Sequence, residues 1–403
     1  GSYNTALGSS ALVSNTTASN NTAVGYQAGY SNTTGTITAF GKTAGYSATT
    51  ATNNSIFGVE ANYYTTTGSE NASFGYNALA FNTTGSYNTA LGSQALRANT
   101  TASQNTAVGY QSLYTNTTGV EMVAVGYEAL RANTTAHTNH AFGYRALKSN
   151  TTGAYNVAVG HSALTANTTA SGNTAAGYKA LYANTTGSAN VAVGQEALIA
   201  ATTGSHNTAI GHTAAISLTT GTFNVAVGRE ALRNLTSGSN NNAIGYSALR
   251  NNTGNNNNAM GYAALYHNTS GAQNTAIGHD ALNSNTTANS NTAMGYQAGY
   301  SNTTGTANNY VGYQAGYSNA TSTTNNAFGN AALYFNTGGS DNVAIGHVAL
   351  YQNTTGSYNS ALGKGALQNN TTASENTAVG YQASGNNTSG LQNVSLGHNA
   401  ARL

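Results

Sequence analysis

The residues that could perform chemistry in this sequence are few and scattered. The chain of 403 residues contains nine acidic residues, nine histidines and no cysteine. The acidic residues occur singly, without a pair at a repeating spacing, so a general acid and its base cannot be assigned. No serine has a histidine and an aspartate at a spacing that identifies a triad. The sequence therefore predicts a protein that is not an enzyme.

Metal and cofactor sites lack the necessary ligands. His137 and His140 lie close together, but no carboxylate or third ligand joins them. Calcium-binding repeats would need an aspartate in each turn, and the chain has only Asp280 and Asp341. We expect neither a metal nor a cofactor.

A polar loop with the pattern Asn-Thr-Thr recurs throughout the chain, and its asparagine often opens an Asn-x-Thr/Ser sequon. One hypothesis is a row of N-linked glycans along one edge. The other is an inward ladder, in which stacked amides bond to their copies above and below. The sixteen candidate glycosylation sites are Asn15, Asn32, Asn82, Asn99, Asn116, Asn133, Asn150, Asn167, Asn184, Asn268, Asn285, Asn302, Asn319, Asn353, Asn370 and Asn387.

Tyrosines and histidines also recur at fixed spacing. The clearest run, Tyr110, Tyr127, Tyr144, His161 and Tyr178, advances by 17 residues at each step. Such a row could be a rigid contact surface for adhesion, for glycan stacking or for bundling of rods. It could equally be stacking of side chains beside a turn.

All of these residues belong to one repeat that fills the chain. In a clean copy, residues 105–109 read Asn-Thr-Ala-Val-Gly, and this glycine recurs from Gly8 to Gly397 in 24 copies. The spacing is 17 residues, with two spacings of 16. We number each repeat so that Asn4 is position 1 and Gly8 is position 5. Position 4 is then large and apolar, positions 3 and 8 are mostly alanine, position 9 is mostly leucine, and position 12 is the loop asparagine.

This repeat is too short for two helices, which excludes the helical solenoids, and its segments have the length of short strands. We predict an all-β fold, a parallel β-solenoid of 24 stacked coils, with residues 1–403 forming a single continuous array. Positions 2–4 and 7–10 should each form a strand, with the glycine at the turn between them. Position 4 should be buried, which would shield Val108, Val125 and Val159. The alanines could line a narrow core or let two chains approach closely.

Composition limits the partners. Only 5% of residues are charged and the net charge is +2, which argues against a nucleic-acid partner. No apolar run reaches the roughly 20 residues of a membrane helix, so we expect no membrane span in this segment. The sequence starts and stops within a repeat, and neither end has the character of a capping repeat. We therefore expect an uncapped excerpt of a longer chain, whose strand edges favour self-association into fibres or multi-chain rods.

The Ala-Φ-Gly pattern, where Φ is a large apolar residue, resembles the YadA-like head repeats of trimeric autotransporter adhesins. Residues 88–92 and 156–160 carry it, and it is similar to repeats of bacterial and phage fibre-like proteins as well. The resemblance implies a parallel β-roll, trimeric assembly and an adhesive surface. Two departures are a period of 17 residues rather than about 14, and a segment from Asn to Gly that is one residue shorter.

The sequence as a whole predicts a non-catalytic structural fibre or surface rod, extracellular or on the cell surface, with or without a glycan coat. The alternative is an adhesin that binds a host or matrix surface through its Tyr/His face. A third hypothesis is an ice-binding threonine array. It is disfavoured because adjacent threonines in a strand point to opposite faces.

Overall fold

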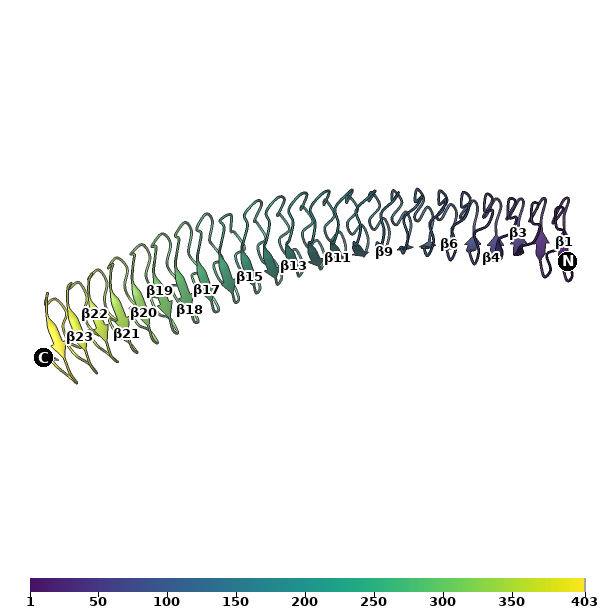
Figure 1. Ribbon diagram of the computed structural model, residues 1–403. Coiled ribbons are helices and arrows are strands. Elements are labelled where there is room, and N and C mark those ends of the chain that lie inside the picture. The colour runs from purple at the N-terminus through teal and green to yellow at the C-terminus, as the bar shows by residue number, and fades with distance from the viewer. Residues whose placement is uncertain (402–403) are drawn as a thin grey trace. The chain divides into compact units, whose positions relative to one another are not determined.

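The computed structural model describes residues 1–401, and it confirms the predicted parallel β-solenoid (Figure 1). Within the described residues all regular structure is β-strand, and each coil contributes one strand. The coils group into two compact units, Gly1–Gly204 and Ser205–Leu403.

The strands are short, and most have three residues. Those of the first unit are β1 (Thr5–Leu7), β2 (Thr22–Val24), β3 (Thr36–Phe40), β4 (Thr52–Phe57), β5 (Ala72–Phe74), β6 (Thr89–Leu91), β7 (Thr106–Val108), β8 (Val123–Val125), β9 (His140–Phe142), β10 (Val157–Val159), β11 (Thr174–Ala176) and β12 (Val191–Val193). Those of the second unit are β13 (Thr208–Ile210), β14 (Val225–Val227), β15 (Asn242–Ile244), β16 (Asn258–Met260), β17 (Thr275–Ile277), β18 (Thr292–Met294), β19 (Asn309–Val311), β20 (Asn326–Phe328), β21 (Val343–Ile345), β22 (Ser360–Leu362), β23 (Thr377–Val379) and β24 (Val394–Leu396).

Consecutive strands within a unit pair in parallel and in register, apart from a shift between Thr36 and Ile37 where β3 pairs with β4. In β7 and β8, for example, Ala107 lies opposite Ala124 and Val108 lies opposite Val125. The same repeat position therefore meets itself in the next coil, which places every side chain in a row along the stack. Adjacent coils, and so adjacent members of a row, are separated by about 4.8 Å, the usual distance between paired strands.

The glycine at position 5 ends each strand for two reasons. Gly109 has a φ of 128°, a backbone conformation that side chains disfavour. A Cβ atom on this residue would also lie 2.4 Å from the carbonyl oxygen of Gly126 in the next coil. The stacked backbones thus approach too closely at this corner for any other residue.

The predicted second strand is wrong: positions 7–10 form a turn. Gln111 and Leu113 have left-handed φ values of 52° and 50°, which break an extended strand. Hydrogen bonding between coils nevertheless continues, because Leu113 N–H donates to the carbonyl of Ala129 at 3.0 Å. The coil therefore keeps its axial hydrogen bonds without strand geometry.

The prediction that position 4 is buried is also wrong. Val159 is 44% exposed, and Val108 and Val125 are only partly shielded. Since side chains alternate along a strand, the fully buried alanine at position 3 faces inward and position 4 must face outward. The core is formed by the alanines and by the leucine at position 9, which is fully buried at Leu113. The alanines therefore line a narrow core within one chain and are not a surface between chains.

Irregular coils preserve the volume of this core. Ile56 and Tyr310 replace the small residue at position 3, and both are fully buried. Glycine then takes the place of leucine at position 9: a Cβ on Gly45 would lie 2.8 Å from Ile56. Likewise, a Cβ on Gly299 or Gly316 would lie 2.7 or 2.3 Å from the Tyr310 ring. A large residue on one wall thus requires a glycine on the other.

Candidate functional site

The loop asparagines that could carry glycans face inward. Fourteen of the sixteen are fully buried, and Asn15 and Asn387 are partly exposed. In a typical coil, the Asn99 Nδ2 atom donates to the Oδ1 atom of Asn82 at 2.9 Å and to the carbonyl of Ala102 at 2.9 Å. The side chains form the amide ladder that was one of the two hypotheses.

A second asparagine ladder, at position 1, was missed by the sequence analysis. Asn88 Oδ1 accepts a hydrogen bond from the backbone N–H of Asn105 at 3.1 Å, and Asn88 Nδ2 donates to the carbonyl of Ala102 at 2.9 Å. The Ala102 carbonyl therefore accepts from both ladders. The near-constant asparagine at position 1 was the signal that could have revealed this second ladder.

The ladder of loop asparagines, at position 12, is interrupted where another residue replaces the asparagine. Ala48 and Ala201 are buried substitutes, and Ala201 is followed by buried leucines at the same position of the next two coils. The asparagines that precede these interruptions, Asn32 and Asn184, each have a buried Oδ1 atom without a hydrogen-bond partner. An interruption thus leaves one unsatisfied acceptor at the end of the intact ladder.

This geometry bears on the glycan hypothesis. N-linked glycans attach to the Nδ2 atom, which in the folded coils is buried and donates to two acceptors, as in Asn116. A glycan would have to replace both bonds and displace the side chain from the core. The folded geometry is that of the ladder, and glycosylation stays a hypothesis to be tested by intact mass.

The predicted Tyr/His row is a continuous stack at position 6. Tyr110, Tyr127, Tyr144 and His161 follow one another with ring centroids 5.2, 5.3 and 4.7 Å apart, and Tyr178 lies 5.5 Å beyond His161. All five side chains are exposed, Tyr110 to 42%. The structure therefore brings the predicted contact residues together on one surface.

The stacking determines what this row can bind. Because neighbouring rings lie face to face, at interplanar angles of 22° and 13° between Tyr110, Tyr127 and Tyr144, their faces are covered. Ring edges and hydroxyl groups are left for a partner. A sugar stacks on a ring face, so within the row it would find hydrogen-bonding groups but no stacking platform. A free face exists only where a stack ends.

The basic residues lie on the same edge of the coil as this row. Of the eleven, Arg402 lies outside the described residues, and the other ten are all at positions 6, 7 or 10: Lys42, Arg97, Arg131, Arg145, Lys148, Lys179, Arg229, Arg233, Arg250 and Lys364. Several lie against the rings, as does Arg145, whose guanidinium carbon is 4.9 Å from the Tyr144 centroid. The net positive charge of the chain is thus carried by its aromatic edge.

One carboxylate in each unit holds a group of these cations. Glu128 pairs with Arg145 and Lys148 at 2.9 Å each and with Arg131 at 3.6 Å. Burial alone would raise the pKa of Glu128, but hydrogen bonds from Lys148 and Arg145 and their charges outweigh it and lower the pKa. In the second unit, Glu230 has a lowered pKa for the same reasons, with Arg250 at 2.9 Å.

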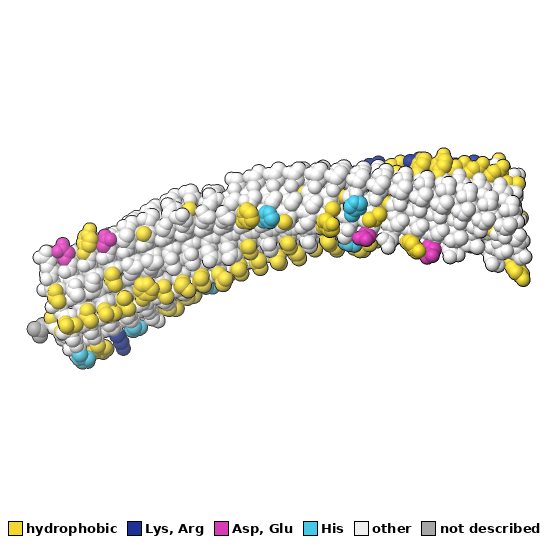
Figure 2. All heavy atoms as spheres, viewed as in Figure 1, with side chains coloured by type: hydrophobic (Ala, Val, Ile, Leu, Met, Phe, Trp, Pro, Cys, Tyr) yellow, Lys and Arg dark blue, Asp and Glu magenta, His cyan; other side chains and the backbone are white. Residues whose placement is uncertain are grey.

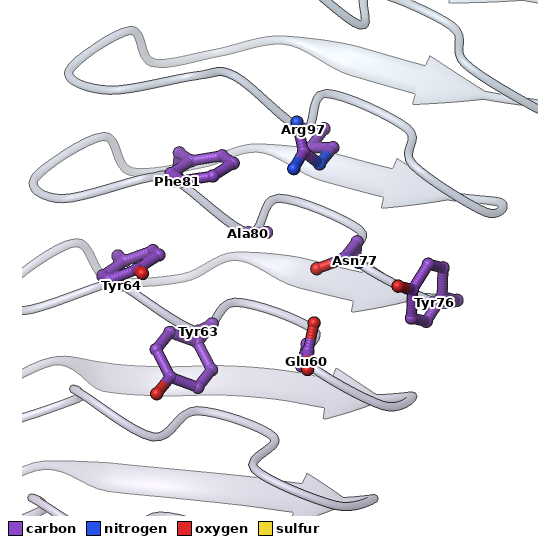
Figure 3. A pocket seen from close by; sticks show the side chains of 8 residues that line it. All are labelled: Glu60, Tyr63, Tyr64, Tyr76, Asn77, Ala80, Phe81 and Arg97. Carbon is purple, nitrogen blue, oxygen red and sulfur yellow. The ribbon is translucent and has the colours of Figure 1, made fainter.

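Two cavities open on this edge, one in each unit. The first has a volume of about 350 Å³ and is lined by Glu60, Tyr63, Tyr64, Tyr76, Asn77, Ala80, Phe81 and Arg97 (Figure 3). The second, of about 420 Å³, includes Tyr262, Tyr266, Arg250, Glu230 and Asp280 in its lining. Both lie between the side chains of positions 6 and 10, over the side chains of position 7. Aromatic walls with a few polar groups are typical of small-molecule sites.

The threonines of the loop offer less than the ice-binding hypothesis needs. The Thr83 hydroxyl, at position 13, donates to the carbonyl of Thr100 at 2.9 Å, and its copies in most coils do the same. Within the loop, the threonine row that is exposed in successive coils is the one at position 14, which includes Thr84. One free row is not a flat two-row array.

Residues 1–401 contain no group of three or more His, Asp or Glu side chains that could hold a metal ion. In the same residues, no helix is long and apolar enough to cross a membrane.

The fold and its edge define the class of this chain as a parallel β-solenoid repeat protein with asparagine ladders inside and an aromatic row outside. No protein-family model matches the sequence, and no curated protein matches it either. The resemblance to YadA-like head repeats therefore rests on the repeat pattern.

Proposed function

We propose that the chain is a non-catalytic structural fibre or surface rod, extracellular or at the cell surface, whose copies associate side by side. One observation carries the proposal: the outward residue at position 4 forms an exposed apolar row over successive strands. Figure 2 shows hydrophobic side chains in rows that cross successive coils. The exposed members of the row are Leu7, Leu91, Phe142, Val159, Val193, Ile210, Met260, Met294, Phe328, Ile345, Leu362 and Leu396.

A second copy suits this row better than an unrelated partner does. Soluble monomers rarely expose long contiguous apolar surface. Neither position 2 nor position 4 of any described strand carries Asp, Glu, Lys or Arg, so two strand faces meet without charge repulsion. Another copy of the same solenoid has the same axial repeat of about 4.8 Å, so each coil of one copy can lie against a coil of the other. The resemblance to fibre-like repeat proteins supports the same assignment.

The ladders support a structural role as well. A regular coil bonds to its neighbour through its backbone and through two buried asparagines, as shown for Asn88 and Asn99. Since a single coil buries too little to be stable alone, stability comes from the contact between neighbours. Such an array resists local opening wherever the ladders are intact.

Sedimentation velocity across a wide concentration range tests the association. The isosteric changes Val125→Thr, Val159→Thr and Val193→Thr, made together, keep strand propensity but reduce the apolar row, and they should weaken association at least tenfold. Tyr110→Ser with Tyr127→Ser is the matched control on the aromatic edge and should leave association unchanged. A monodisperse single chain at every concentration would count against the proposal.

The second candidate is an adhesin, and the exposed Tyr110–Tyr178 row favours it. Its hydroxyl edges and adjacent cations could bind a polar, acidic surface on a host or matrix. In this case, binding to matrix-coated surfaces should fall in the Tyr110→Ser, Tyr127→Ser variant and persist in the valine variants. The same two sets of variants therefore separate the candidates.

A further inference from the structure

The tyrosine stack at position 10 of the first unit stops abruptly. Tyr30 and Tyr46 stack with centroids 5.0 Å apart, and Tyr46 and Tyr63 follow at 4.9 Å with an interplanar angle of 6°. The next residue of this row is Ala80, which has no ring. The parallel stack thus ends at Tyr63, whose ring also makes a T-shaped contact with Tyr64, with centroids 4.7 Å apart.

The cavity of about 350 Å³ lies at this missing ring (Figure 3). Tyr63 is on the coil before Ala80 and Arg97 is on the coil after it, two steps of about 4.8 Å apart. A ring placed over Ala80 would have Tyr63 on one side and the coil of Arg97 on the other, where the Arg97 guanidinium lies over the Phe81 ring, 4.7 Å from its centroid. One side is closed by Phe81, which stacks on Tyr64 at 5.2 Å, and the opposite side is bounded by Tyr76.

The polar groups of the cavity are arranged for a ligand with hydroxyl groups. Glu60 can only accept hydrogen bonds, and Asn77 can donate and accept. Arg97 donates to the Tyr114 hydroxyl at 3.2 Å through Nη1, and its guanidinium carbon lies 4.7 Å from the Phe81 ring centroid.

These groups select a neutral polar ring. Glu60 and Arg97 have opposite charges, so the cavity carries no net charge that would attract an ion. A purely aromatic ring would fill the space but offer no hydrogen-bonding groups to Glu60 and Asn77. A pyranose offers an apolar C–H face for Tyr63 and hydroxyl groups around its rim.

We propose that the Ala80 cavity binds a neutral pyranose ring of a saccharide, stacked on Tyr63 and hydrogen-bonded by Glu60, Asn77 and Arg97. This site does not overlap the surface proposed for side-by-side association, which is the outer face of the strands. The volume lies within the range of about 300–1,000 Å³ that is usual for small-molecule sites.

The cavity of the second unit is an internal comparison. Tyr262 is at position 6 there and Tyr266 and Arg250 are at position 10, but Arg250 lies on the coil before Tyr266, and Glu230 and Asp280 are at position 7. Arg250 is already engaged, since its Nε atom donates to Glu230 at 2.9 Å and its Nη1 atom to the Tyr266 hydroxyl at 3.1 Å. Arg97 makes no ion pair within residues 1–401. We therefore expect the first cavity to bind the saccharide more tightly.

Saturation-transfer NMR and calorimetry on the whole chain test the proposal, with the methyl glycosides of glucose, galactose, mannose and N-acetylglucosamine as probes. At least one should bind. Ala80→Tyr restores the missing ring of the stack and should abolish binding without loss of stability. Gln368→Tyr adds a ring at position 10 of another coil and is the matched control, which should bind as the unmodified chain does.

Glu60→Gln keeps the shape of the cavity and replaces a charged acceptor. Because a hydrogen bond to a charged acceptor is stronger than one to a neutral acceptor, it should weaken binding about tenfold or more. The proposal is overturned if none of the four glycosides binds, or if binding is unchanged in Ala80→Tyr. Preferential binding of p-cresol over every glycoside would also overturn it, because the cavity would then select an aromatic ring.

Discussion

The asparagine ladder makes a quantitative prediction about two substitutions that look alike. Asn184→Leu and Asn353→Leu each replace a fully buried loop asparagine, with glycine three residues later. The Nδ2 atoms make nearly equal bonds: 2.9 Å to the preceding asparagine for Asn184 and 2.8 Å for Asn353, and 2.9 Å to a carbonyl in both. The difference is at Oδ1, which accepts from Asn370 at 2.8 Å in Asn353 and is unpartnered in Asn184, beside Ala201.

The two changes therefore alter the number of unsatisfied acceptors differently. Asn353→Leu interrupts an intact ladder, leaves Asn336 Oδ1 without its donor and removes one acceptor of Asn370. Asn184→Leu lengthens an existing interruption: it leaves Asn167 Oδ1 without its donor but eliminates the unsatisfied Oδ1 of Asn184 itself. One buried unsatisfied group costs about 1–3 kcal/mol, so Asn353→Leu should be about 2 kcal/mol more destabilising than Asn184→Leu.

Native-state hydrogen exchange measures this difference, since a long repeat array need not unfold in a single two-state step. The opening free energies of amides in the substituted coil and its two neighbours are compared with those of the unmodified chain. Asn353→Leu should accelerate exchange in its coils about thirtyfold relative to the effect of Asn184→Leu, by the tenfold equivalence of 1.4 kcal/mol. Equal effects, or a larger effect at Asn184, would refute the inference that interrupting an intact ladder leaves a costly unsatisfied acceptor.

Three further predictions test other contacts. Leu164→Ala should cost about 2–5 kcal/mol in local unfolding free energy, because the leucine side chain is fully buried. Val159→Ala, on the outer face, should cost less than about 1 kcal/mol, and hydrogen exchange measures both changes. Gly126→Ala should disrupt its coil, because the new Cβ atom would lie 2.3 Å from a backbone oxygen. Gly172→Ala, whose Cβ atom would have its nearest neighbour at 3.9 Å, should lower the stability by only about 1–2 kcal/mol, and melting curves distinguish the two variants. Because the pKa of Glu128 is lowered in the folded state, its ion pairs stabilise the fold above about pH 4.5 and lose this contribution as the pH falls through the folded-state pKa. Glu128→Gln should therefore make local hydrogen exchange less dependent on pH in the acid range.

The repeat pattern predicted the architecture because a strict period imposes the same environment on every copy. The glycine at position 5 was correctly placed at a turn, and the strand at positions 2–4 was found in every coil. The aromatic row was found as well, since residues at one repeat position must share one row. Periodicity, however, says which residues are neighbours without saying which face of the coil they occupy.

That choice of face explains the errors. Large apolar side chains were expected inside, and Val159 is outside, because the coil is too narrow to hold both it and the leucine of position 9. The left-handed conformation of Leu113 was not predicted, since leucine rarely adopts it. Glycines at the same position, such as Gly29 and Gly45, were the available signal, because glycine is the residue that adopts a left-handed φ without strain.

The sequence by itself determined the period, the parallel stacking and the rows in which asparagines, tyrosines and apolar residues recur, because these follow from repetition alone. Only the tertiary structure decided whether each row faces the core or the solvent. It directed the loop asparagines inward, where a narrow core must satisfy its own carbonyl groups, and it directed position 4 outward. It also located the cavity at Ala80, which depends on side chains from three successive coils and cannot be read from any single repeat.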